Sequence, residues 1–174
     1  MQRTVILAAI LALIGAPAAF VSAQGTDFSG TWQLDRDASD IPEGRGGGGG
    51  GGGGRGRGGF GAMTAETLMI SQSEASVTIE QSQGNRSQRV EYALDGTETT
   101  IEQGRGTLTV TASWDGGTLV TSGTQEMETP RGNVSLELTE LRTLSADGQT
   151  LVIESTRGTP RGERTMTLVY RRTL

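Results

Sequence analysis

From residue 65 onward, the chain is a series of short segments in which apolar and polar residues alternate with period two. In the clearest segment, four apolar residues (Leu108, Val110, Ala112 and Trp114) alternate with three hydroxyl residues (Thr109, Thr111 and Ser113). Period two is typical of β-strands that bury one face. We find no segment with helical periodicity, so the pattern predicts an all-β protein.

Turn signals such as Asp95-Gly96 and Asp147-Gly148 separate about ten of these segments. The expected strands lie near residues 31–34, 68–70, 77–79, 90–94, 99–101, 108–114, 118–126, 134–138, 151–153 and 166–170. The short connections favour antiparallel hairpins. A sheet of this length buries its apolar face either as a single up-and-down barrel of 8–10 strands or as a two-sheet sandwich. Alternation alone leaves both architectures open.

The first residues predict a secretory signal peptide rather than part of the fold. Arg3 precedes an apolar run at 5–14, and Ala23 ends a small-residue cleavage site. We expect cleavage between Ala23 and Gln24, export to a periplasmic or extracellular location, and no stable membrane insertion. The predicted organisation is a signal peptide at 1–23, the first strand with an acidic loop at 24–43, an insert at 44–61, and the remainder of the barrel at 62–174.

The insert consists of glycine and arginine apart from Phe60. Glycine loses the most entropy on ordering and this segment has almost nothing to bury, so a disordered surface insert is expected. Arg-Gly-rich segments can bind RNA, but the chain as a whole carries 20 acidic against 15 basic residues and a net charge of −5. An acidic chain is poorly suited to nucleic acid, and no such partner is expected.

The chain contains no histidine and no cysteine. The usual triad base, the thiol nucleophile and the commonest transition-metal ligands are therefore missing, so we expect no catalytic residues, no cofactor and no metal. The acidic group at Asp35, Asp37, Asp40 and Glu43 lacks the pattern of a calcium loop and is expected to be solvated. Four strand carboxylates are also expected to face water: Glu137, Glu140, Glu154 and Glu163.

Several short motifs resemble one known superfamily. The segment at 28–34, Phe-Ser-Gly-Thr-Trp-Gln-Leu, is similar to the opening strand of the calycins, and the segments at 114–119, 145–152 and 168–172 are similar to the last hairpins of its fatty-acid-binding branch. With the glycine-rich insert, the chain resembles secreted bacterial lipocalin-like proteins. The resemblance covers residues 27–36 and 66–172 and implies a barrel. It also implies that Trp32 lies at the closed end, covered by Arg172.

The chain departs from the fatty-acid-binding branch at its ligand-anchoring residues. The glycine insert stands where that branch has a helical lid. The two carboxylate-binding arginines of the branch fall at Leu168 and near Leu144, and only Tyr170 of the anchoring group matches. Because no predicted inward stripe carries an arginine, a charged ligand deep in the barrel is not expected.

The leading functional expectation is an exported, non-catalytic barrel that binds a small, mostly apolar molecule. The candidate ligand-binding residues are Tyr92, Trp114, Met166, Leu168 and Tyr170. The alternative is a structural or protein-interaction module whose barrel is filled by its own side chains, with an unknown protein partner. A cavity above about 300 Å³ would favour the binding protein. A carboxylate-only hydrolase is the third possibility.

Overall fold

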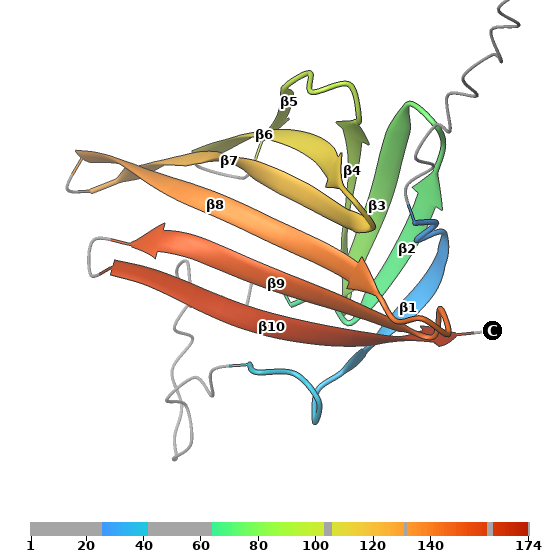
Figure 1. Cartoon of the computed structure of the whole chain (residues 1–174). Coiled ribbons are helices and arrows are strands. Elements are labelled where there is room, and N and C mark those ends of the chain that lie inside the picture. Colours follow the sequence, from blue (N-terminus) through green and yellow to red (C-terminus); the bar gives the residue numbers. More distant parts are fainter. Residues whose placement is uncertain (1–25, 42–63, 103–105, 131, 160–161, 174) are drawn as a thin grey trace, which may run out of the picture.

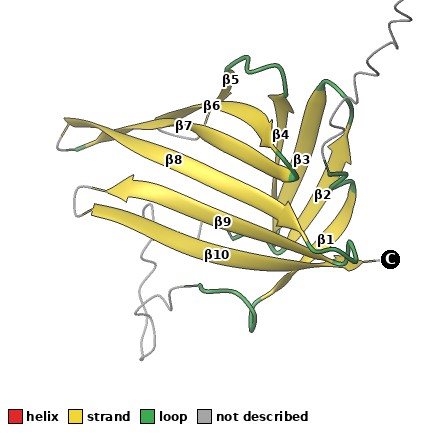
Figure 2. Ribbon diagram, in the orientation of Figure 1, coloured by secondary structure: helices red, strands yellow, loops and turns green. Residues whose placement is uncertain are grey.

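The described part of the chain forms one antiparallel sheet that curls into a nearly closed barrel (Figure 1). The computed structural model describes residues 26–41, 64–102, 106–130, 132–159 and 162–173. Its ten strands are β1 (Gly30–Asp35), β2 (Thr67–Gln72), β3 (Ser76–Gln83), β4 (Arg86–Ala93), β5 (Thr99–Glu102), β6 (Gly106–Asp115), β7 (Thr118–Thr129), β8 (Gly132–Leu144), β9 (Thr150–Thr159) and β10 (Gly162–Thr173). The described residues contain no helix, as Figure 2 shows. The all-β prediction with about ten strands is confirmed.

The strand order decides between barrel and sandwich. Neighbours in the sheet run β4-β3-β2-β1-β10-β9-β8-β7-β6-β5, so the first strand pairs with the last. In that pairing Trp32 lies opposite Arg172 and Leu34 lies opposite Tyr170. All other pairings join strands that are consecutive in the chain, which is the up-and-down topology of a barrel.

The two ends of this sheet, β4 and β5, meet without a backbone ladder among the described residues. One side-chain hydrogen bond joins them: the Thr99 hydroxyl donates to the Glu91 carbonyl at 3.3 Å. We call this junction the β4–β5 seam.

The tight turns depend on glycine where the backbone requires it. Gly116, between β6 and β7, and Gly148, between β8 and β9, have φ values of 58° and 68°. This left-handed conformation is readily adopted by glycine and disfavoured for other residues. In the second turn, the Asp147 carboxylate accepts hydrogen bonds from the Ser145 hydroxyl at 2.5 Å and from the Gln149 amide at 3.0 Å.

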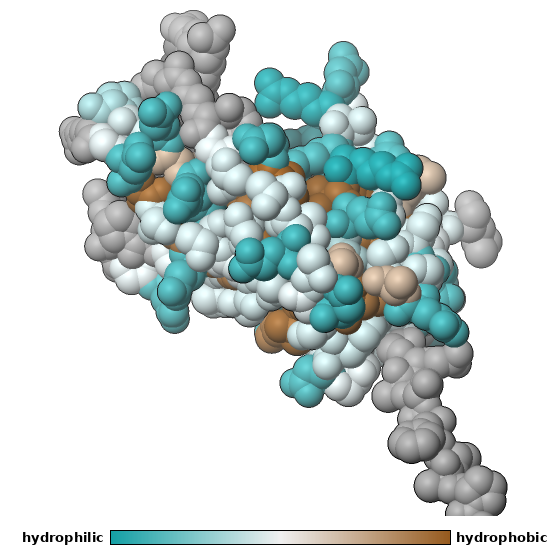
Figure 3. All heavy atoms as spheres, turned by 90° about the horizontal axis from the view of Figure 1, so that it is seen from above, coloured by the Kyte–Doolittle hydropathy of each residue, from teal (hydrophilic) through white to brown (hydrophobic). Residues whose placement is uncertain are grey.

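The apolar stripes predicted from the alternation lie inside the barrel. Phe28, Trp32, Leu119 and Leu151 are fully buried. The outer surface is mostly polar, and the apolar residues visible from above lie between polar ones (Figure 3). Among the described residues, the one large apolar side chain that is exposed is Met69 on β2. The core therefore belongs to the inner face of one curled sheet.

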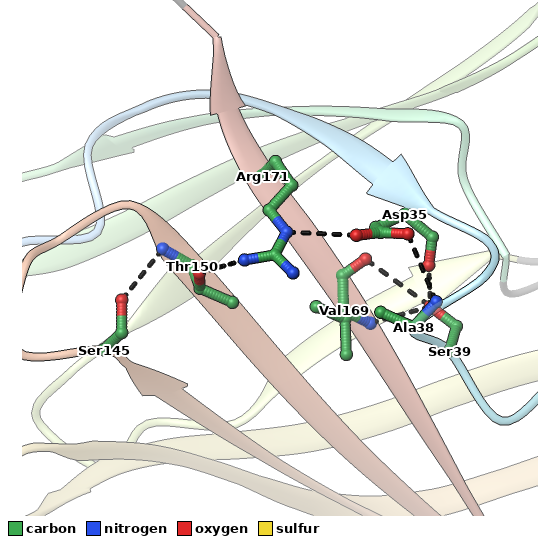
Figure 4. A network of polar contacts seen from close by, with 7 residues as sticks. All are labelled: Asp35, Ala38, Ser39, Ser145, Thr150, Val169 and Arg171. Carbon is green, nitrogen blue, oxygen red and sulfur yellow. Dashed lines mark hydrogen bonds and ion pairs between the residues drawn. The ribbon is translucent and has the colours of Figure 1, made fainter.

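After β1 ends, the chain continues along the edge of β10 with which β1 pairs (Figures 1 and 4). The Asp40 amide donates to the Thr167 carbonyl at 2.8 Å, and the Val169 amide donates to the Ser39 hydroxyl at 2.9 Å. The Arg171 guanidinium donates through Nε to Asp35 at 3.0 Å. Asp35 is thus not simply solvated: hydrogen bonds fasten the first part of the acidic loop to the last strand.

Some predictions fall outside the described residues, namely the signal peptide at 1–23, the insert at 44–61 and Glu43. Within the described ranges, no three acidic side chains come together in a group fit to hold a metal ion. The same ranges include no apolar helix of membrane-spanning length.

Candidate functional site

The barrel contains an open cavity of about 910 Å³. Residues from β3 to β9, together with Ala65 just before β2, line it. At the β3–β4 hairpin the lining residues Gln83, Asn85 and Arg86 are exposed, so the cavity reaches solvent there. Its volume lies within the range of about 300–1,000 Å³ that is usual for small-molecule sites.

The lining has an apolar wall and a polar wall. Buried side chains of β4 and β6 form the apolar wall: Val90, Tyr92, Leu108 and Val110. On the polar wall, Thr121 and Gln125 of β7 lie beside Glu140 of β8 and Arg157 of β9. A molecule in this cavity would meet both hydrocarbon and hydrogen-bonding groups, and polar lining continues onto β3 and β4 at Gln81, Ser82 and Gln88.

Glu140 of the polar wall forms an ion pair with the buried side chain of Arg142. The side chain of Arg142 is 2% exposed, and its guanidinium NH2 pairs with Glu140 Oε2. NH1 donates to the Thr121 hydroxyl at 3.0 Å. The Ser155 hydroxyl donates to the other oxygen of Glu140 at 3.4 Å. Three strands thus hold Glu140 and Arg142 in fixed positions.

This pair corrects two expectations from the sequence. Glu137, Glu154 and Glu163 are exposed, as predicted, but Glu140 faces the cavity. An arginine does lie on an inward stripe, contrary to the expectation that none would. The physical reason is the length of β8, which continues past Leu138 to Leu144, so that period two places residues 140 and 142 on the inner face.

Burial and charge act in opposite directions on these groups. Burial acts to lower the pKa of Arg142, but the Glu140 carboxylate raises it, and the net shift is upward. Burial lowers the pKa of Arg157, although Glu140 opposes this shift. Burial raises the pKa of the Tyr92 hydroxyl. The centroid of the Tyr92 ring lies 5.8 Å from Arg142 Cζ. Glu140 is therefore the carboxylate that compensates the buried cations.

The five predicted ligand-binding residues occupy different places. Tyr92 lines the cavity. Met166 and Leu168 are buried in the core, and the Tyr170 hydroxyl donates to the Ala65 carbonyl at 3.0 Å. Trp114 stacks on Phe28, with centroids 5.6 Å apart and planes within 1°. For all five residues, contact with a ligand stays a prediction.

Trp32 and Arg172 are in contact at the closed end. Arg172 Cζ lies 4.3 Å from the centroid of the Trp32 ring. The guanidinium also donates to the carbonyls of Gly148, at 2.8 Å, and Ser29, at 2.7 Å. Trp32 Nε1, the one polar atom of the indole, donates to the Phe28 carbonyl at 3.0 Å. This pair seals the end of the barrel away from the exposed β3–β4 hairpin.

Comparison with known proteins finds proteins of similar structure but none of similar sequence. No protein-family model matches the chain, and no curated protein matches it. Among solved structures, the REP1-NXSQ fatty acid transporter matches with a TM-score of 0.56 and 14% identity, covering 84% of this chain and 96% of its own. Human cRBP IV matches with a TM-score of 0.55 and 18% identity, covering 85% and 99%.

Zebrafish ileal bile acid-binding protein, solved in complex with cholic acid, matches with a TM-score of 0.52 and 16% identity over 84% of this chain and 98% of its own. At these identities the likeness shows the fold alone. The chain shares with these proteins the fold of a single antiparallel up-and-down barrel.

Proposed function

We propose that this chain is an exported, non-catalytic barrel that binds a small, mostly apolar molecule. The observation that carries the proposal is the 910 Å³ cavity with one apolar and one polar wall. A barrel filled by its own side chains would leave no such space, so the structural-module alternative is less well supported. The similar structures include a fatty acid transporter and a bile acid-binding protein, which supports binding rather than catalysis.

The two walls suggest how such a ligand would lie. Burying apolar ligand surface against Val90, Leu108 and Val110 supplies free energy of about 25 cal/mol per Å². The polar wall supplies orientation, because a buried polar atom of the ligand needs a hydrogen-bonding partner there. An apolar body with one polar end satisfies both walls at once.

The proposal that the protein is exported rests on the sequence pattern at 1–23, which predicts cleavage between Ala23 and Gln24. The test is intact mass measurement of the protein recovered from its host. A mature form that begins at Gln24 supports export, and a chain that retains residues 1–23 contradicts it.

The binding proposal is tested by mass spectrometry and by a cavity-filling variant. Native mass spectrometry of protein from its own host, before and after organic extraction, should show a bound mass of a few hundred daltons that extraction removes. In parallel, the apo protein should bind the neutral dye Nile red. V110W places an indole on the apolar wall and should weaken Nile red binding at least tenfold.

M69W is the matched control, because Met69 is 55% exposed and lies outside the cavity lining. It should bind the dye like the unmodified protein. A folded V110W variant with unchanged dye affinity would contradict the cavity as the binding site. Failure of the unmodified protein to bind dye or any co-purifying molecule would favour the filled-barrel alternative.

A further inference from the structure

We propose that Glu140 is a specificity-determining residue that makes the cavity select uncharged, hydroxyl-bearing apolar molecules over acids of the same size. This inference rests on the proposed binding function and specifies its ligand class. It follows from which group of the buried ion pair faces the cavity. Glu140 is a lining residue, whereas Arg142 lies behind Glu140 and Thr121.

Both terminal nitrogens of the Arg142 guanidinium already have partners inside the protein. NH2 is paired with Glu140, and NH1 donates to Thr121 at 3.0 Å. Carboxylates bind arginine most strongly through two parallel N–H groups. A ligand carboxylate that approached NH1 and NH2 would have to compete with Glu140 and Thr121 for this guanidinium. The protein's own carboxylate thus takes the place that a ligand acid would need.

The position of Glu140 is fixed through both of its oxygens. Oε2 pairs with Arg142, and Oε1 accepts a hydrogen bond from Ser155 on β9. The Glu140 side chain is 13% exposed, so it is shielded from bulk water on most sides. Turning it away would leave Arg142 buried without its counter-ion, and Arg142 Nε already has no hydrogen-bonding partner among the described residues.

A carboxylate that faces a cavity accepts hydrogen bonds and repels negative charge. The charge of Glu140 disfavours a second ionised carboxylate beside it. A ligand hydroxyl, by contrast, can donate to a remaining lone pair of Glu140 without adding charge. An ester of the same length has no donor and gains nothing from Glu140. The expected order of affinity is therefore alcohol, then ester, then acid.

Arg157 is the group that could favour an acid. It also lines the cavity, and its charge interacts with Glu140. Its side chain is only half-buried, and Arg164, its direct neighbour on β10, is exposed. Water therefore screens this cation more than it screens the buried pair, and Glu140 offsets part of its attraction for an anion.

The test compares three ligands with the same chain length at neutral pH: 1-dodecanol, methyl dodecanoate and dodecanoate. Each is titrated against Nile red bound to the full mature protein. We expect 1-dodecanol to displace the dye at concentrations at least tenfold lower than dodecanoate, with the ester between them. Equal or tighter binding of dodecanoate would overturn the role of Glu140 while leaving the binding function intact. Failure of the protein to bind Nile red or any of the three would contradict the binding function itself.

The variant E140Q removes the charge and keeps the shape. The affinity for dodecanoate should then rise at least tenfold relative to the affinity for 1-dodecanol, because Arg142 has lost its internal counter-ion. E137Q on the same strand is the matched control: Glu137 is exposed, and E137Q should keep the original order. If E140Q is unstable, dodecanoate should raise its melting temperature more than 1-dodecanol does. An unchanged preference for the alcohol in folded E140Q would contradict the assignment.

Discussion

Arg172 and Trp32 lie directly opposite each other on the last and first strands, with the guanidinium over the indole ring. The contact joins the first strand to the last strand, which are neighbours within the sheet. Arg172 also binds the carbonyls of Ser29 and Gly148, so one side chain links β10 to the entry of β1 and to the β8–β9 turn. The closed end therefore depends on contacts between residues that are far apart in sequence.

Removing the indole should destabilise the barrel strongly. Trp32 is fully buried, so W32A should lower the free energy of unfolding by about 3–5 kcal/mol, the usual range for deletion of a large buried side chain. Denaturant unfolding measures this. Q33A is the control, because Gln33 is exposed on the opposite face of β1. A W32A variant that melts within about two degrees of the original would contradict the structural role.

The stack of Phe28 on Trp114 should couple the segment before β1 to the end of β6. A double-mutant cycle with F28L and W114L should give a coupling free energy of about 0.5–1.5 kcal/mol, the range for aromatic pairs. Thermal unfolding of the four proteins supplies the measurement. If the effects of the two substitutions on the free energy of unfolding are additive, each ring stabilises the fold only through its own burial and the stacking adds nothing.

The hydroxyl of Tyr170 should contribute through its hydrogen bond to Ala65. Y170F removes the donor but retains the buried ring, and the Ala65 carbonyl then loses a partner in a buried place. The expected loss of stability is about 1–3 kcal/mol. Denaturant unfolding of Y170F tests this, and a variant as stable as the original would show that water replaces the bond.

The contact between Asp35 and Arg171 predicts a dependence of stability on pH. The hydrogen bond from Arg171 lowers the pKa of Asp35. A group with a lowered folded-state pKa stabilises the fold above its ordinary pKa of about 3.9, and this contribution is lost as the pH falls through the folded-state value. The melting temperature of D35N should therefore lie below that of the original at neutral pH, and the difference should shrink in acid.

D37N is the control for this prediction, because Asp37 is exposed nearby and has no ion pair with a described residue. The difference in melting temperature between D37N and the original protein should change less from neutral to acidic pH than the corresponding difference for D35N. A D35N difference that stays constant down to about pH 2 would show that the contact with Arg171 does not persist in solution.

The sequence predicts the strands and the inner face well, because period two is a local property. Leu108, Val110 and Ala112 alternate clearly, and all three are buried. The sequence does not predict the ion pair, because charged residues on a strand are expected to face water and the apolar stripe of the eighth strand ends at Leu138. Continuing the alternation to Glu140 and Arg142 would have found it. The period fixes a side chain's face and not its partner, so the stack of Trp114 on Phe28 could not be predicted.

The β4–β5 seam gives this barrel a property that a fully closed one lacks. A ring of strands with ladders on every side can widen only by breaking backbone hydrogen bonds. Here the circumference has two free ends, which the described residues join through side-chain packing and the hydrogen bond between Thr99 and Glu91. Separating these two strands would therefore leave all nine ladders intact.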